Sequence, residues 1–263
     1  MKLAVNFSNP LVKQIKAKEI KVDLIKCPDW EGMLAEALPY GPVVIHFSLD
    51  AGLGRTLSAD FSRMDQFIAE TGTPHINSHL VTPRSCTPDD PTELKRVNDL
   101  WRDEIGRMVD YFGAERVVLE HYPFTLATPY LAPAVDPETF SKVITDTGCQ
   151  FLLDLAHARI TADTLGMDVR DYIRALPLDR LTEMHVTGIR PFGGVLTDHF
   201  EMENQSWELL DWALQEIHAG HWKEPRLVAF EYGGVGDIFV WRTDEDVIRS
   251  QVPRLYEMVH RYD

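Results

Sequence analysis

The feature of this sequence that most constrains its fold is a regular alternation of short apolar runs with longer segments of helical spacing. Eight runs of five or six residues have the aliphatic and β-branched composition of buried strands. They are Lys2–Phe7, Ile20–Ile25, Val43–Phe47, His75–His79, Arg116–Glu120, Phe151–Leu155, Leu181–Val186 and Leu227–Tyr232. The segments with helical spacing are Phe61–Thr71, Thr92–Gly113, Pro137–Gly148, Val169–Ala175, Ser206–His218 and Asp244–Tyr262.

Eight alternations within 263 residues match the number of units and the size of a (β/α)8 barrel. A doubly wound sheet would have fewer strands and a glycine-rich first turn, and no G-x-G-x-x-G follows the first run. No linker or change of composition divides the chain, so we predict an α/β protein with one TIM-barrel domain over residues 1–263. The segments Tyr122–Asp136 and Ile189–Glu203 are long for connections, and we expect them to build the active-site face.

Charge and cysteine content narrow the class of protein. Lys and Arg total 26 and Asp and Glu total 41, which gives a net charge of −15 at pH 7. Nucleic-acid-binding proteins usually present a basic face, so we expect no nucleic-acid partner. The three cysteines form no C-x-x-C pair, which favours a reducing compartment. The sequence begins with no signal-peptide pattern and has no long apolar stretch, so we expect a cytoplasmic protein without a membrane span.

Residues that can bind a divalent metal stand where most of the predicted strands end. In a (β/α)8 enzyme the chemistry lies at the carboxyl ends of the strands, so these positions share one mouth. A single histidine or carboxylate there is more often a structural residue or a helix cap than a ligand. Converging carboxylates, however, repel one another unless a cation lies between them. The candidate ligands are His46, His79, Glu120, Asp154, His157, His185, Asp198, His199 and Glu231.

This set of donors is too large for one ion. A first-row metal takes four to six donors, so about nine donors fit two or three ions bridged by carboxylates. Imidazole and carboxylate donors without thiolate fit iron, manganese or zinc. Two further histidines lie close in sequence: His75 should share a strand face with His79 and could support the ligands, whereas His121 should point towards the helices.

The strings that contain these candidates resemble one family. They are VVIHFSLDAGLG, HINSHLVTP, VVLEHYP, GCQFLLDLAHARI, ALPLDRLTEMHVTGI, LTDHF and LVAFEYGG. In this order, from Pro42 to Gly233, they resemble the multinuclear non-heme iron-dependent oxidases, which are TIM barrels of the xylose-isomerase-like superfamily. Characterised members modify residues of ribosomally made peptides with dioxygen and often work with a separate peptide-recognition protein. The resemblance therefore implies a peptide or small-molecule substrate and two or three ions, with iron as the metal.

The resemblance also implies how the ligands are shared. His46, His79 and Glu120 would bind one iron, Asp154, His185 and Glu231 a second, and Asp198 with His199 a third. The chain departs from the family pattern where His157 replaces an asparagine, where Asp198 and His199 are adjacent instead of Asp-x-His, and where Lys26-Cys27-Pro28 replaces a glutamate-rich strand end. Since an imidazole binds a cation better than an amide does, we predict that His157 lies within ligand distance of a metal.

Other activities use the same superfold. The quartet that holds one ion in sugar isomerases and epimerases is present as Glu120, Asp154, His185 and Glu231. That activity would leave His46 and His79 without a ligand role. The Asp154-x-x-His157 pair resembles endonuclease IV, an activity that the charge of −15 disfavours. A metal-binding protein without activity is the last alternative. We predict a metal-dependent oxidoreductase whose catalytic residues are Glu120, Glu231 and His157.

Overall fold

Nine parallel strands form one curled sheet in the computed structural model, which describes residues 1–262. Their order is β3-β2-β1-β11-β8-β7-β6-β5-β4. The strands are β1 Lys2–Asn6, β2 Leu24–Pro28, β3 Val43–His46, β4 Asp50–Ala51, β5 Ile76–Leu80, β6 Val117–His121, β7 Gln150–Asp154, β8 Leu181–Val186 and β11 Leu227–Phe230. The two-residue β4 continues the course of β3 and pairs with β5, so the sheet has the eight positions of a (β/α)8 barrel.

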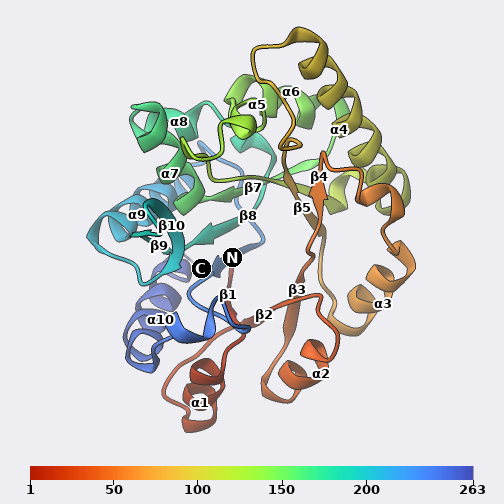
Figure 1. Cartoon of the computed structure of the whole chain (residues 1–263). Helices are drawn as coiled ribbons and strands as arrows, with labels where there is room; N and C mark the ends of the chain where they lie inside the picture. The colour runs from red at the N-terminus through yellow and green to blue at the C-terminus, as the bar shows by residue number, and fades with distance from the viewer. Residues whose placement is uncertain (263) are drawn as a thin grey trace.

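The α-helices surround the strands and follow one another round the barrel (Figure 1). They are α1 Asn9–Ala17, α2 Met33–Ala37, α3 Phe61–Thr71, α4 Pro91–Phe112, α5 Ala132–Val135, α6 Pro137–Thr147, α7 Leu155–Leu165, α8 Val169–Arg174, α9 Asn204–His218 and α10 Glu245–Val259. Aspartate side chains accept backbone N–H groups at the first turns of most of the longer helices, as Asp136 does for α6. The predicted fold class is therefore confirmed.

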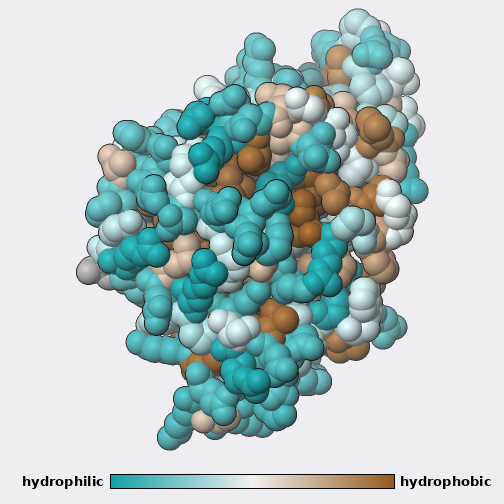
Figure 2. Space-filling model, turned by 90° about the vertical axis from the view of Figure 1, so that its left-hand side faces the viewer, coloured by the Kyte–Doolittle hydropathy of each residue, from teal (hydrophilic) through white to brown (hydrophobic). Residues whose placement is uncertain are grey.

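The main apolar core lies between the strands and the helices. Its largest fully buried side chains include Trp101 of α4, Phe140 of α6, Phe151 of β7 and Tyr172 of α8. The outer surfaces of the helices remain polar: the side of the molecule at the left of Figure 1 is mostly hydrophilic, with apolar residues in small groups (Figure 2). None of the helices described combines the length and the apolar composition that a membrane span requires.

The inside of the barrel differs from this outer core. Small apolar side chains, Ala4, Val44, Leu227 and Ala229, form a separate buried cluster there. The remaining inward positions of several strands hold buried polar and charged residues instead, which are Lys26, Asn77, Glu120, Asp154, Glu183 and His185. Charged groups inside a barrel are expensive to bury without partners, so this lining points to a functional role for the interior.

Side chains close the barrel between β3 and β5. In the described chain β3 forms no backbone ladder with β5, and only the two-residue β4 that follows β3 pairs with β5. Instead, the amide of Asn77 accepts from Phe47 N at 2.7 Å and donates to Phe47 O, and Thr73 Oγ1 accepts from Ile45 N at 3.0 Å. The same Asn77 amide lies 3.0 Å from His46 Nε2, so this seam also orients a candidate ligand.

Several predicted elements are wrong in extent or were not predicted. The strand predicted at Ile20–Ile25 is Leu24–Pro28, because the residues before Leu24 are solvent-accessible loop. The segment Ile189–Glu203, expected as a loop, contains an antiparallel hairpin, β9 Gly188–Phe192 and β10 Val195–Phe200. The sequence pattern also gave no prediction for four of the helices, namely α1, α2, α5 and α7.

Candidate metal centre

Parallel pairing brings the candidate ligands to one end of the barrel. His79 of β5 is in register with Glu120 of β6, and Asp154 of β7 with His185 of β8. Side chains in register on parallel strands point to the same face, here the interior. Glu231 follows β11 directly and extends this row. The residues form three sets of potential ligands, and the donor atoms of each set lie within 4.8 Å of one another: His46, His79 and Glu120; His46, His185 and Glu231; and Glu120, Asp154 and His157.

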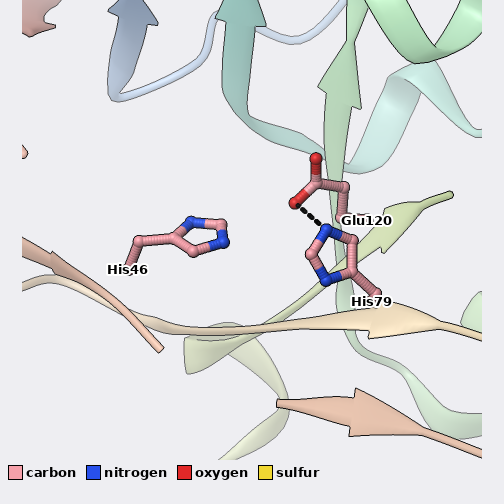
Figure 3. A group of neighbouring side chains, drawn as sticks. All are labelled: His46, His79 and Glu120. Atoms are coloured by element: carbon pink, nitrogen blue, oxygen red, sulfur yellow. Dashed lines mark ion pairs between the residues drawn. The ribbon is translucent and has the colours of Figure 1, made fainter. Parts of the chain in front are cut away.

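The first set spans the seam between β3 and β5. His79 Nε2 lies 3.2 Å from Glu120 Oε2, and the ring of His46 points towards this pair from the opposite side (Figure 3). The other nitrogen of His79, Nδ1, is 3.5 Å from Asp50 Oδ1, which orients the ring. One imidazole on each side of a carboxylate oxygen leaves a position between the three side chains that suits an ion.

Carboxylates surround the Nδ1 atom of His185. Its distances are 3.3 Å to Glu120 Oε1, 3.4 Å to Glu231 Oε2 and 3.8 Å to Asp154 Oδ2. Nε2 of the same ring lies 2.7 Å from Glu183 Oε1. An imidazole whose far nitrogen is held by a carboxylate, and whose near nitrogen faces other carboxylates, is the usual arrangement of a metal-binding histidine.

Unpartnered buried atoms test whether this mouth fits a metal. Glu120 Oε2, Asp154 Oδ2 and His185 Nδ1 are buried without a hydrogen-bond partner in the described structure, although they lie close together. Buried polar atoms nearly always have a partner, and a carboxylate without one is costly. Divalent cations bound at the mouth would satisfy all three, so the donor set fits metals of the imidazole and carboxylate type.

His157 lies in the first turn of α7, where Asp154 is the N-cap and accepts from His157 N at 2.8 Å. The Nδ1 atom of the ring is 2.9 Å from the carbonyl oxygen of His121, an acceptor, so Nδ1 donates. The other nitrogen, Nε2, faces Asp198 Oδ2 at 2.9 Å and Asp154 Oδ2 at 3.7 Å. The ring therefore has the orientation expected of a ligand, with Nε2 directed to the carboxylates. Its binding of an ion stays a prediction.

A bulge in the hairpin brings Asp198 and His199 to the mouth together. The register of β10 with β9 shifts between Thr197 and Phe200, and His199 has a left-handed φ of 61°. Consecutive strand residues normally point to opposite faces, and the extra residue of a bulge removes this constraint. Both side chains line the cavity described below, so the adjacent pair can serve the role of an Asp-x-His pair.

The sequence did not predict a charged layer beneath these residues. Glu183, two residues before His185 on β8, contacts His75 through one oxygen and lies 3.1 Å from Lys26 Nζ through the other. Lys26 Nζ is also 2.8 Å from Glu231 Oε1 and contacts His185 Nε2. His75 therefore supports the ligands through Glu183. The signal for Glu183 was its position two residues before a candidate ligand, which places both on the same strand face.

Burial and the neighbouring carboxylates act in opposite directions on the histidines of the mouth. Burial lowers the pKa of His185, but Glu231 and Glu120 outweigh burial and raise that pKa to about 10. The pKa of His157 is raised well above its usual value in the same way, against burial, by Asp154 and Asp198. At His46 burial dominates, Lys26 adds to it, and the pKa falls to about 3. The field that favours imidazolium at His185 and His157 also favours a divalent cation there.

A cavity of about 410 Å³ opens above the candidate ligands. His46, His79, His157 and Glu231 contribute to its floor, and its walls include Trp30, Tyr122, Ile238 and Phe239. The site thus combines an ionic floor with largely apolar walls, as substrate sites commonly do.

The other histidines lie away from this cavity. His121 is buried against Phe140, Phe151 and Tyr172 on the helix side of the sheet, as its position in the strand predicted. The rest pair with neighbours at the surface: His218 stacks on Tyr262, His221 lies 2.6 Å from Glu216, and His260 lies 2.8 Å from Asp23.

Comparison with known proteins extends these observations. A family model described as "RiPP precursor modification enzyme MbnB/TglH/ChrH" matches residues 92–223. The chain is also similar to a UPF0276 protein of Acaryochloris marina, with 23% identity over 214 residues, which are 77% of this chain and 71% of that protein. The chain spans about two thirds of the length of the curated relatives that it matches.

Two solved structures share the fold. A xylose isomerase domain-containing protein from Salmonella typhimurium has a TM-score of 0.61 and 12% identity, and the match covers 98% of this chain and 97% of that one. The IolI protein, solved with a bound zinc atom, has a TM-score of 0.63 and 16% identity, and the match covers 100% and 99% of the two chains. These likenesses confirm a xylose-isomerase-like TIM barrel and carry no further conclusion about activity.

Proposed function

Because the chain belongs to the RiPP precursor modification enzymes of the MbnB/TglH/ChrH family, we propose that it is a multinuclear non-heme iron oxidase that modifies a peptide with dioxygen. The family membership supports a peptide substrate, and the donor set of the mouth supports a metal-dependent reaction.

The two oxygens of Glu120 carry the proposal. Oε2 faces His79 at 3.2 Å, whereas Oε1 lies 3.3 Å from both His185 Nδ1 and His157 Nδ1. A carboxylate whose oxygens face two different groups of ligands is suited to bridge two ions. A site for one ion would leave one side of Glu120 unused.

The ligands divide between the two sides of Glu120. On one side, His46 and His79 would hold one ion with Glu120 Oε2. On the other side, Asp154, His185 and Glu231 would hold a second with Glu120 Oε1. His157, Asp198 and His199 lie next to the second position and would complete its surroundings or hold a further ion. Imidazoles mixed with carboxylates are donors that ferrous iron accepts, and manganese or zinc would fit as well.

Iron bound here would supply the redox chemistry with dioxygen, and the side chains of this chain do the rest. Glu183 fixes His185 by accepting at Nε2, so that Nδ1 stays directed to the carboxylates. His157, held at Nδ1 by the carbonyl of His121, presents Nε2 towards Asp198 at the cavity, where it can exchange a proton with a bound group. Trp30 and Phe239 form apolar walls that exclude water from the floor.

The cavity also favours a substrate without a phosphate group. Of the cationic side chains that line it, Lys26 is occupied by Glu231 and Glu183, and Arg242 donates to Asp198 O at 2.9 Å and packs over aromatic rings. Neither has the freedom to hold an anionic ligand. A peptide side chain with its flanking apolar surface fits this lining better than a sugar phosphate or a nucleic acid.

The metal content of anaerobically purified protein tests the proposal. We expect about two ferrous ions per chain by elemental analysis and Mössbauer spectroscopy. The double variant His46→Ala, His79→Ala should lose one ion and retain the other, because it removes the histidine ligands on only one side of Glu120. The variant His218→Ala, which changes a histidine far from the mouth, is the matched control and should keep the wild-type content.

A sugar isomerase or epimerase is the second candidate, favoured by the three carboxylates within 3.8 Å of His185 Nδ1. Such an enzyme needs one ion and no ligand role for His46 or His79. An unchanged metal content in the double variant would therefore support this alternative and contradict the oxidase.

A further inference from the structure

Lys26 is a buried cation in the wall of the cavity. Its side chain is 3% exposed, and Nζ lies 2.8 Å from Glu231 Oε1, 3.1 Å from Glu183 Oε1 and in contact with His185 Nε2. An ammonium group has three N–H donors, and the carboxylates of Glu231 and Glu183 accept two of them, whereas His185 Nε2 is itself a donor to Glu183. Because these partners enclose Nζ, we expect Lys26 to act on the residues around it and not on a substrate.

The charge of Lys26 is permanent in this environment. Two carboxylates lie within 3.1 Å of its Nζ atom, those of Glu231 and Glu183. A buried ammonium with two carboxylate partners is retained as a cation, since neutralising it would leave both carboxylates unpaired.

A count of charges links Lys26 to the number of metal ions. The acidic side chains of the mouth and of the layer below it that are at most 15% exposed are five carboxylates, Glu120, Asp154, Glu183, Asp198 and Glu231. With the ammonium of Lys26 they leave four negative charges, which two divalent cations neutralise. Asp50, at the rim and 30% exposed, lies 3.8 Å from Arg55 and is left out of this balance.

Lys26 also restricts one ligand directly. Because Oε1 of Glu231 is held by the ammonium, only Oε2 remains directed to His185 Nδ1, at 3.4 Å. A cation bound by Glu231 would lie close to the positive charge of Lys26 and be repelled by it, strongly so in a buried site.

We propose that Lys26 is a fixed cation of the metal centre, which occupies one oxygen of Glu231 and limits the centre to two divalent ions. This inference rests on the proposed function, because it requires that the mouth binds metal. Lys26 is then a positioning residue, which sets the number and affinity of the ions without touching the substrate.

Metal titration of Lys26 variants tests the inference. Chelated protein is titrated with Mn²⁺ in air and with Fe²⁺ without oxygen, and ions per chain and dissociation constants are measured by elemental analysis and calorimetry. Wild type should bind two ions. Lys26→Met should bind the weaker ion at least about tenfold more tightly, or take up a third, because a repelling charge is lost. Lys26→Arg keeps the charge and should resemble wild type.

The matched control is Lys223→Met. Lys223 donates to Gln150, at the start of β7 and thus the opposite end of the barrel, so its removal changes the net charge equally without changing the mouth. If Lys26→Met does not fold, Lys26→Gln replaces it, since glutamine removes the charge and keeps a donor for Glu231.

The outcomes separate the two proposals. No metal on wild type would overturn the proposed function itself. Two ions on wild type with unchanged affinity in Lys26→Met or Lys26→Gln would overturn only the role of Lys26. Three ions on wild type would overturn the role of Lys26 as well, because the centre would then not be limited to two. Weaker metal binding in the neutral variants, with normal binding in Lys26→Arg, would also overturn that role, because Lys26 would then support metal binding.

Discussion

The outside and the inside of the strand barrel differ in the polarity of their buried side chains. Between the strands and helices, side chains such as Trp101, Phe140 and Phe151 form a continuous apolar core. Inside the strands, the buried apolar cluster consists of only four residues, and charged groups occupy much of the rest. The difference teaches that the outer core stabilises the fold, because buried apolar area is the main favourable contribution. The interior can then carry charged groups that are costly to bury, a cost that a bound cation would offset.

The strongest test of this comparison is a cavity in the outer core. Phe140 is fully buried against Phe151 and His121. We expect Phe140→Ala to lower the free energy of unfolding by about 3–5 kcal/mol, since a large buried ring is lost. Urea denaturation measures the change. Tyr111→Ala removes a ring that is 52% exposed and is the control. A loss in Phe140→Ala no larger than in this control would contradict the assignment of stability to the outer core.

A substitution that removes one negative charge inside the barrel should weaken metal binding and leave the free energy of unfolding nearly unchanged. In Asp154→Asn the amide oxygen still caps α7 by accepting from His157 N, but one negative charge is lost. We expect metal affinity to fall by at least about 100-fold, more than the loss of an outer partner causes. The stability of the metal-free protein should change by less than about 1 kcal/mol.

The control for this variant is Asp136→Asn, which changes the N-cap of α6 at the surface of the protein. It should alter neither property. If metal binding survives in Asp154→Asn, then Asp154 has only its capping role.

The pH dependence of the metal-free protein should come from the inside of the barrel. The pKa of His185 is raised to about 10, so the stability it contributes is complete below pH 6.5 and is lost as pH rises towards 10. We expect the free energy of unfolding to fall by about 3 kcal/mol between pH 6.5 and 9.5. Saturating Mn²⁺ should reduce this fall, because the bound ring is already neutral. A flat profile without metal would show that the carboxylates do not hold a proton on His185.

The smallest effect is expected where the outer core contains a polar residue. His121 is fully buried and neither ring nitrogen has a partner among the residues described. Burial, with His157 next, lowers its pKa to about 3, so His121 costs stability as pH falls from 6.5 towards 3. His121→Leu should stabilise the protein by about 1 kcal/mol or less and reduce the loss in acid. Equal acid loss in wild type and variant would contradict this, and His218→Leu at the surface is the control.

The sequence predicted the barrel because its elements are long and regular. Segments such as Phe61–Thr71 keep helical spacing over three turns, and the structure places α3 within the same bounds. The helix α7 was not predicted because Leu155 continues the apolar strand before it without a turn signal. The sequence signal for the hairpin is the pair Gly193-Gly194. Both residues have positive φ, as a two-residue hairpin turn requires.

Most of the candidate ligands were visible in the sequence because they stand at or just after strand ends, where a barrel gathers side chains. Lys26 directly follows the predicted second strand but was not assigned to the mouth, because an ammonium group is not a metal ligand. Its partners Glu183 and Glu231 lie more than 150 positions away in the chain. Such a pairing depends on the register of closed strands, which no local pattern contains.

The seam between β3 and β5 links metal binding to the closure of the barrel. His46 and His79 lie on its two sides, where the side chains of Asn77 and Thr73 and a backbone hydrogen bond from His79 N to Leu49 O tie the two segments together. An ion shared by these two histidines would act as a clasp that closes the barrel, and its binding energy would add to the stability of the closed form. We therefore expect metal-free protein to open first at this seam. A protease should then degrade metal-free protein faster than metal-loaded protein.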